Sequence, residues 1–262
     1  MNVNSFLNFL AIQAIIKNKE KDGIQKSINT IFQKLKNYDN DKNRIDKCFI
    51  FGSYKRSTII SREFDDNSDI DIMVVFGKKF GGFYNFDPAN EIKKPQTYLN
   101  YLKDFAQSSY PRSEIYQSHP TIVLELNHIK FDLVPAITNV FGTFQIPNKQ
   151  DWYQIQDWIP TNPNDLDKAL NKNQNLRRLV RIAKVWNANQ GYIYLSYDLE
   201  KWITQQYFYG NLAEYFYTFC KLLPINYDLS QEKMRKIKKL KEVVENAQIY
   251  NDSSYIEKLL GF

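Results

Sequence analysis

The chain has 262 residues, 43% of them hydrophobic and 24% charged, which predicts one globular unit or two closely packed lobes and argues against a disordered protein. Its formal net charge of +6, from 35 Lys and Arg against 29 Asp and Glu, suits a polyanionic ligand such as a nucleotide or nucleic acid, but also a protein that is merely soluble. There is no signal-peptide pattern and no apolar run of about eighteen residues, and two cysteines and two histidines argue against a disulfide framework or a zinc site. We therefore expect a cytoplasmic protein without a membrane span.

The first expected element is a helix over residues 3–36, in which isoleucines recur at helical spacing with lysines between them. Residues 37–43 form a polar break before the first apolar strand. After the second strand, residues 77–90 predict a loop rich in glycine and aromatic residues. Residues 95–109 then predict another helix, with Pro95 suited to its first turn.

The segment 51–76 carries the strongest functional pattern. It predicts the end of one strand, a turn at Gly52 and Ser53, a connector, and a second strand that begins with Asp69 and Asp71. Side chains two positions apart share one face of a strand, so the two carboxylates project together while the intervening isoleucines face the other way. Paired carboxylates need a countercharge such as Mg²⁺, and the turn can offer N–H groups and a hydroxyl to a triphosphate. Either motif alone is typical of an ordinary turn or a solvated strand end, but their combination favours function.

A predicted hairpin supplies a third carboxylate. Residues 121–137 read TIVLELNHIKFDLVPAI, two apolar runs joined at Asn127 and His128, and Asn tolerates the positive φ of a tight turn. Asp132 is the acid of the second strand, which is otherwise apolar apart from Lys130. An unpaired acid is costly to bury, so Asp132 either faces solvent at a sheet edge or joins Asp69 and Asp71 at a metal site.

From residue 162 onward the pattern is helical. Within the segment 175–187, NLRRLVRIAKVWN, an apolar stripe lies beside a basic face formed by Arg177, Arg181 and Lys184. Such a face is commonly solvated, but an NTP needs a cation for its outer phosphates.

The next segment, LSYDLE over residues 195–200, offers two further candidates. Ser196 can cap a helix and bind a phosphate oxygen, or be a plain cap, and Tyr197 offers a ring on which a base can stack. The basic segment 235–242, RKIKKLKE, is typical of a solvated helix face, although it could hold RNA.

These motifs together resemble a known group of enzymes. Gly52-Ser53, Asp69-x-Asp71 and Asp132 before Leu-Val-Pro-Ala resemble the polymerase-beta-type nucleotidyltransferase superfamily. More narrowly, SDIDIMVVF, FDLVPAI, WIPTNP, LRRLVRIAKVWN and LSYDLE are similar to the cGAS/DncV-like nucleotidyltransferases, over about residues 50–200. Those bacterial enzymes make cyclic di- or trinucleotide signals in defence against phage.

The resemblance implies roles for particular residues. Three aspartates would be catalytic and would bind two Mg²⁺ ions, for which Mn²⁺ can substitute. The Gly-Ser turn would hold the donor triphosphate, a lysine and a serine would grip its outer phosphates, and a tyrosine would stack on a base. The residues concerned are Asp69, Asp71 and Asp132 for metal and catalysis, and Gly52, Ser53, Lys184, Ser196 and Tyr197 for nucleotide binding.

The resemblance also implies the fold and the reaction. We expect an α/β (α+β) protein with a polymerase-beta-like core, residues 37–160, built on a mixed and mainly antiparallel sheet. Residues 1–36 and 161–262 would form a helical lobe packed on that core, with a cleft between the two. The expected reaction links NTPs such as ATP and GTP into a cyclic di- or trinucleotide and releases pyrophosphate.

The expected partners are NTP substrates and, indirectly, an effector protein that reads the product; we expect a monomer. The chain is short for the family and has no Cys/His cluster for the zinc insertion of DNA-sensing animal relatives, so no activation by DNA is expected. Two alternatives stay open. One is a nucleotidyltransferase that modifies RNA 3′ ends or a protein, of the toxin–antitoxin type. The other is a non-catalytic nucleotide- or RNA-binding module.

Overall fold

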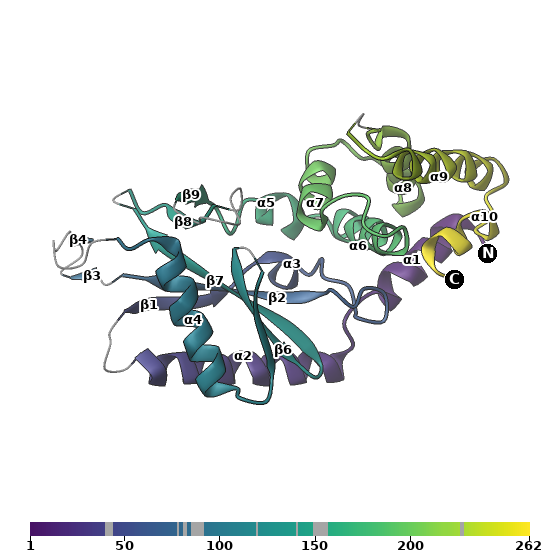
Figure 1. Ribbon diagram of the computed structural model, residues 1–262. Helices are drawn as coiled ribbons and strands as arrows, with labels where there is room; N and C mark the ends of the chain where they lie inside the picture. The colour runs from purple at the N-terminus through teal and green to yellow at the C-terminus, as the bar shows by residue number, and fades with distance from the viewer. Residues whose placement is uncertain are drawn as a thin grey trace. The chain divides into compact units, whose positions relative to one another are not determined.

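The computed structural model describes residues 1–39, 44–77, 79–80, 83–84, 92–118, 120–139, 141–148, 157–225 and 228–262. The chain divides into two compact units (Figure 1). We name them the sheet unit, Lys17–Lys55 with Asp69–Asp165, and the helical unit, Met1–Ile16 with Arg56–Ser68 and Leu166–Phe262. The segment 56–68 therefore leaves the sheet unit between two of its strands and belongs to the helical unit.

The sheet unit contains a seven-stranded sheet. Its main path runs in the order β1-β2-β7-β6-β5, and β8 and β9 continue from β7. Only β2 and β7 pair in parallel among the described strands; the other pairs of this sheet are antiparallel, which confirms a mixed and mainly antiparallel sheet. The strands are β1 Ile45–Ile50, β2 Asp69–Phe76, β5 Glu114–Ser118, β6 Thr121–Leu126, β7 Ile129–Thr138, β8 Phe144–Pro147 and β9 Trp158–Thr161.

Strand β7 is the centre of this sheet and changes partner along its length. On one side it pairs with β2 throughout, and on the other side first with β6 and then with β8. Pro135 lies between the last β6 partner, Leu133, and the first β8 partner, Ile137. A proline cannot donate to a ladder, so it is tolerated where one neighbouring strand has ended and the next has not begun.

The predicted hairpin is confirmed. Leu126 of β6 pairs with Ile129 of β7, which leaves Asn127 and His128 as the two-residue turn. Within the predicted glycine-rich loop, by contrast, the structure places a short antiparallel ribbon of β3, Lys79–Phe80, and β4, Phe83–Tyr84. The rest of that predicted loop after Gly77 lies outside the described residues.

Two long helices of the sheet unit are amphipathic. Helix α2, Asn18–Asp39, buries the isoleucines of the predicted stripe, and α4, Pro95–Ser109, starts at the predicted proline. At the end of α2 the buried Asp39 carboxylate accepts hydrogen bonds from the N–H groups of Arg44 and Ile45, at 2.9 and 2.8 Å, and from the Tyr101 hydroxyl at 2.7 Å. This carboxylate therefore fixes the entry into β1.

A short helix, α3 at Gly52–Lys55, follows β1.

The helical unit is built around the apolar face of α6, Gln174–Asn189, whose Trp186 is fully buried. No helix among the described residues has the length and apolar character needed to cross a membrane. The other helices are α1 Val3–Gln13, α5 Asp167–Asn171, α7 Ser196–Thr204, α8 Leu212–Leu222, α9 Gln231–Tyr250, α10 Ser254–Glu257 and a 3₁₀ turn at Lys258–Leu260.

The prediction of one helix over residues 3–36 is wrong, because the chain forms α1 and α2 with a break between them. The carbonyl of Ala14 accepts a hydrogen bond from the Ser61 N–H at 2.9 Å, and the Lys17 N–H donates to the Glu20 carboxylate at 3.0 Å. Backbone groups at the end of α1 and at the start of α2 thus have separate hydrogen-bond partners, although no Gly or Pro marks the break. Helix α1 belongs to the helical unit and α2 to the sheet unit, so the units also differ from the expected 37–160 core.

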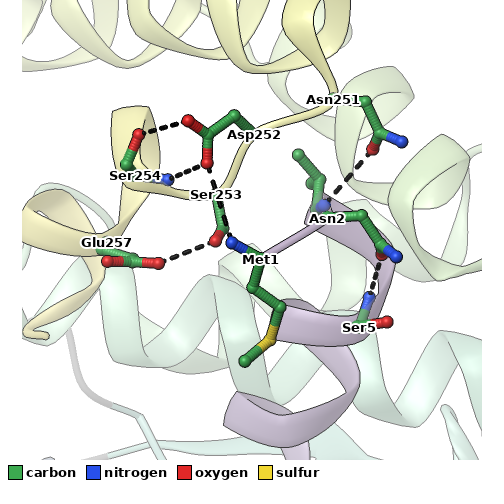
Figure 2. Close-up of polar contacts among 9 residues, drawn as sticks. Met1, Asn2, Ser5, Asn251, Asp252, Ser253, Ser254 and Glu257 are labelled. Carbon is green, nitrogen blue, oxygen red and sulfur yellow. Dashed lines mark hydrogen bonds and ion pairs between the residues drawn. The ribbon is translucent and has the colours of Figure 1, made fainter.

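Both chain termini lie in the helical unit. The N-terminal amine lies 3.8 Å from the Asp252 carboxylate, and the Val3 N–H donates to the Asn251 side chain at 3.3 Å (Figure 2). Asn251 ends α9 in the left-handed conformation, with φ of 48°, and the next turn leads into α10. These contacts attach the start of α1 to the turn between α9 and α10.

Candidate active site

The turn after β1 is tightly packed against β2. The Phe51 N–H donates to the Asp71 carbonyl at 3.1 Å, and Gly52 follows with a φ of +69°. A Cβ atom on Gly52 would lie 1.8 Å from Oδ2 of Asp71. Glycine is therefore required both for the left-handed backbone and for the space that the Asp71 carboxylate occupies.

Strand β2 presents its aspartates as the sequence predicts. Asp69 and Asp71 are half-buried, whereas Ile70 and Ile72, which alternate with them, are fully buried on the opposite face. The alternation confirms that both carboxylates project from one face of the strand.

Asp132 lies on the strand next to this pair. In the parallel register of β2 and β7, Asp71 is opposite Asp132 and Asp69 is opposite Lys130. Burial and the Asp69 carboxylate raise the pKa of Asp132 from 3.8 to about 7, against the effects of a 3.1 Å hydrogen bond from the Thr121 hydroxyl and of the Lys130 charge. The raised pKa reflects the burial of Asp132 and its closeness to the Asp69 carboxylate.

This group of carboxylates is not a closed metal cage. Among the described residues, no cluster of three or more His, Cys, Asp or Glu side chains is arranged to hold a metal ion. The donor set that the strands do bring together consists of carboxylate oxygens, the ligands that Mg²⁺ prefers.

The other predicted nucleotide-binding residues lie in the helical unit. Lys184 is buried on α6, and its ammonium lies 2.7 Å from Oε2 of Glu200 on α7. Ser196 is exposed and is the first residue of α7, whose N-cap is Leu195, so the prediction that Ser196 caps this helix is wrong. Tyr197 is 46% exposed, and the Lys201 ammonium lies 5.9 Å from the centre of its ring.

The predicted basic face of α6 is not an open stripe. Arg181 is buried and donates to the carbonyls of Ala11 and Ser57, at 3.1 and 2.8 Å. Arg177 donates to the carbonyls of Leu170 and Asn171, at 2.6 and 2.9 Å. These two arginines therefore connect elements of the helical unit.

The predicted site residues thus fall into two groups. Strands β1, β2 and β7 bring together the Gly52–Ser53 turn and three aspartates in the sheet unit, while Lys184, Ser196 and Tyr197 belong to the helical unit. Sequence reasoning missed Glu200 and its partner Arg56. The available signal was an acid on the buried face of α7, between Leu199 and Ile203.

A mixed sheet with aspartates on two parallel neighbouring strands, preceded by a Gly-Ser turn, defines a nucleotidyltransferase fold. Residues 1–175 match the SMODS family, the Second Messenger Oligonucleotide or Dinucleotide Synthetase domain. The chain belongs to this family, which is one of nucleotidyltransferases. It is also 25% identical to a probable cyclic nucleotide synthase of Bacillus cereus (strain VD146), in an alignment of 248 positions that covers 79% of this chain and 72% of the relative.

Solved structures share this fold over most or all of the chain's length. CdnC of E. coli MS115-1, solved with ATP, has a TM-score of 0.68 at 14% identity, covering 100% of this chain and 98% of its own. CdnG of Bradyrhizobium diazoefficiens, solved with GTP, has a TM-score of 0.71 at 13% identity, covering 98% and 95%. The Vibrio cholerae DncV cyclic AMP-GMP synthase has a TM-score of 0.67 at 11% identity, covering 95% and 92%. The fold is therefore that of the cGAS/DncV-like nucleotidyltransferases.

Proposed function

We propose that this protein is a Mg²⁺-dependent nucleotidyltransferase that links NTPs into a cyclic di- or trinucleotide second messenger, releases pyrophosphate and serves in defence against phage. The observation that carries the proposal is the register of β2 and β7, in which Asp71 is opposite Asp132 and next to the Gly52 turn. Membership of the synthetase family supports the class of product. The likeness of the motifs to the cGAS/DncV-like enzymes supports the role in defence.

The chemistry of the three aspartates suits a divalent cation. Asp69, Asp71 and Asp132 offer oxygen ligands alone, and the raised pKa of Asp132 reflects burial beside another acid, which a cation would offset. Because no closed cluster exists among the described side chains, cation binding requires these carboxylates to turn toward a common point. When bound, Mg²⁺ supplies activation of an acceptor hydroxyl and stabilisation of the leaving pyrophosphate, and Mn²⁺ can replace it.

The chain's own residues then orient the reactants. Gly52 and Ser53 bind the donor triphosphate through N–H groups and a hydroxyl, and Asp132 accepts the proton of the acceptor ribose hydroxyl at a carboxylate oxygen. The hydroxyl oxygen attacks the α-phosphorus, the bond from that phosphorus to the bridging oxygen breaks, and pyrophosphate leaves. Lys184 and Ser196 contact the outer phosphates, and Tyr197 stacks on a base. Repetition of the transfer within the linear product closes the ring.

The test is incubation of the intact chain with the four NTPs, with and without Mg²⁺, followed by mass spectrometry of the products. We expect a small phosphatase-resistant product that requires Mg²⁺. Asp69→Asn with Asp71→Asn should abolish nucleotide incorporation and leave the melting temperature without Mg²⁺ unchanged or higher, because the substitution removes repulsion between acids. The matched control removes two exposed acids of α9, Glu242→Gln with Glu245→Gln, and should keep full activity.

Other outcomes separate the alternatives. Label that appears only in RNA 3′ ends or on a protein would identify a macromolecule-modifying nucleotidyltransferase. Binding of nucleotide or RNA without any incorporation by the unsubstituted chain would identify a non-catalytic module. Product formation by the double aspartate variant would contradict the assignment of Asp69 and Asp71 to the metal.

A further inference from the structure

A buried polar cluster lies inside the helical unit, and of its four residues only Lys184 takes part in a step above. Glu200, 1% exposed, receives hydrogen bonds on Oε1 from the Arg56 guanidinium at 2.8 Å and from the Thr58 hydroxyl at 2.7 Å. The Lys184 ammonium lies 2.7 Å from its other oxygen, Oε2. Arg56, Thr58 and Lys184 are themselves buried, at 5%, 0% and 7% exposure. We refer to these four residues as the Glu200 cluster.

The Glu200 carboxylate contacts two cations. One of its oxygens lies 2.8 Å from the Arg56 guanidinium and the other 2.7 Å from the Lys184 ammonium. Burial by itself would raise the pKa of Glu200, but the Lys184 ammonium and the Arg56 guanidinium outweigh it and lower that pKa from 4.5 to about 2. The carboxylate is therefore ionised at neutral pH and attracts both cations.

The backbone beside the Glu200 cluster is held in an uncommon conformation. Ser57, between Arg56 and Thr58, has a φ of +58°, which a residue with a side chain rarely adopts. Its carbonyl accepts a hydrogen bond from Arg181 of α6 at 2.8 Å. Three consecutive residues are thus fixed by side chains of α6 and α7, and a strained backbone that its surroundings hold in this way is common at functional sites.

Sequence position connects this fixed segment with the proposed triphosphate site. Arg56 directly follows α3, the short helix that begins with Gly52 and Ser53. Glu200 lies one helical turn after Ser196 in α7, and Lys184 comes from α6. The Glu200 carboxylate therefore contacts Lys184, a proposed phosphate ligand. It lies on α7, the helix that begins with the second proposed ligand, Ser196. It also binds Arg56, which directly follows the short helix that begins with Gly52 and Ser53.

We propose that Glu200 is the positioning residue of the triphosphate site. One of its oxygens fixes the Lys184 ammonium, and the other fixes the exit of the Gly52–Ser53 turn through Arg56 and Thr58. This role rests on the proposed function. Glu200 does not itself contact the NTP; it orients the residues that do.

A residue that restrains Lys184 is needed because the lysine side chain is flexible. Lysine has four rotatable bonds and a strongly hydrated charge, so an unrestrained Lys184 would lose side-chain freedom on binding phosphate. An ammonium carries three N–H donors, and a contact to one carboxylate oxygen uses one of them. Glu200 therefore restrains Lys184 before the NTP arrives without exhausting its donors.

The test measures kcat and apparent KM for NTP, together with melting temperature, for the intact chain and its variants. Glu200→Gln keeps the shape of the side chain but removes its charge and places an N–H group against one of the cations. We expect apparent KM to rise at least about tenfold with a smaller change in kcat, since a charge-assisted contact that orients a phosphate ligand is lost. Glu200→Asp should recover part of the lost affinity.

A double-mutant cycle with Lys184→Met tests whether the two residues act together. We expect Glu200→Gln to change KM much less when Lys184 is already absent, because a positioning residue acts through the residue that it holds. If Glu200→Gln does not fold, Thr58→Val removes one hydrogen bond to Oε1 and keeps the ion pairs, and we expect a smaller rise of KM in the same direction.

The matched control is Asp39→Asn, which changes a buried, hydrogen-bonded carboxylate of the sheet unit. It should lower the melting temperature and leave KM unchanged. The positioning role would be overturned if folded Glu200→Gln, or in its place Thr58→Val, keeps the KM of the unsubstituted chain and only melts earlier, or if the effects of Glu200 and Lys184 simply add. Absence of any NTP incorporation by the unsubstituted chain would instead refute the proposed function, so the two failures differ.

Discussion

Gly52 shows how one residue is constrained by backbone and neighbour at once. Its φ is +69°, and an added Cβ would lie 1.8 Å from Oδ2 and 2.7 Å from Cγ of Asp71. Gly52→Ala therefore strains the backbone and forces the Asp71 carboxylate away from its position. We expect a loss of nucleotide incorporation of tenfold or more and a melting temperature lowered by a few degrees, on the order of 1 kcal/mol.

The measurement is product formation by Gly52→Ala at saturating Mg²⁺, compared with Gly191→Ala. Gly191 also has a positive φ, +75°, but no atom lies within 4 Å of its would-be Cβ. It shares the backbone strain and lacks the clash with a site residue. Equal activity losses in the two variants would show that the Asp71 contact is unimportant.

The pH dependence of stability follows from Glu200. Its pKa is lowered from 4.5 to about 2 in the folded chain, chiefly by Lys184 and Arg56 acting against burial. A lowered folded-state pKa stabilises the protein above the ordinary pKa, and this stabilisation is lost as pH falls from about 4.5 toward 2. The shift corresponds to a contribution on the order of 3 kcal/mol at neutral pH.

We therefore expect Glu200→Gln to lower the free energy of unfolding most at about pH 5 to 7, with a difference from the unsubstituted chain that shrinks as pH falls below about 4. Urea denaturation at a series of pH values measures this. A difference that is the same at about pH 3 and pH 7 would mean that the charge of Glu200 does not contribute to stability.

At the scale of elements, several lysines of α9 bind backbone carbonyls of other parts of the helical unit, two of them at the C-terminal ends of helices. Lysines of α9 donate to the carbonyls of Tyr192, Gln190 and Lys221, at 3.1, 3.0 and 3.1 Å. The donors are Lys233, Lys236 and Lys241, and the last two lie in the basic segment 235–242. Gln190 caps α6 and Lys221 lies in the last turn of α8, where a cation is favoured. These lysines therefore connect helices as well as supplying positive charge.

Helix α8 begins with a capping box whose strength is measurable. The Asn211 side chain accepts hydrogen bonds from the N–H groups of Ala213 and Glu214, and the Glu214 carboxylate accepts from the Asn211 N–H at 2.8 Å. We expect Asn211→Ala to lower the free energy of unfolding by about 1 kcal/mol in urea denaturation. Asn211→Asp should keep most of this stabilisation, because an aspartate can also cap the helix. A loss as large in Asn211→Asp would contradict the capping explanation.

At the scale of the whole molecule, the chain alternates between its two units and so makes neither from one contiguous segment. Helix α1 contributes fully buried Val3, Leu7 and Leu10 to the core that α6 and α8 help to form. The family match over residues 1–175 ends just after α6 begins. The matched segment therefore lacks most of the core that α1 needs.

We expect residues 1–175 expressed alone to bind a hydrophobic dye strongly and to unfold without a sharp transition, because the apolar face of α1 has lost its partners. The full chain is the control and should bind little dye and unfold cooperatively. A cooperative transition in the fragment, with protected amides in α1, would show that the matched segment folds without α6 to α9.

The amino-acid sequence by itself determined the elements whose signal is local. Alternation in β2 and β7, the two-residue turn at Asn127 and His128, and Pro95 at the start of α4 all follow from the spacing of neighbouring residues. The motifs around Gly52, Asp69 and Asp132 likewise led to the family that the comparison confirmed.

Only the tertiary structure decided which distant groups meet. The break between α1 and α2 depends on Ser61 reaching the Ala14 carbonyl, and no local residue signals it. Lys184 looked like part of an open basic face, yet it is buried against Glu200, which also receives Arg56 from far along the chain. A buried charge needs a partner, and the fold can supply that partner from a distant part of the sequence. A periodic pattern indicates which face of a helix is buried but not which residues lie opposite that face.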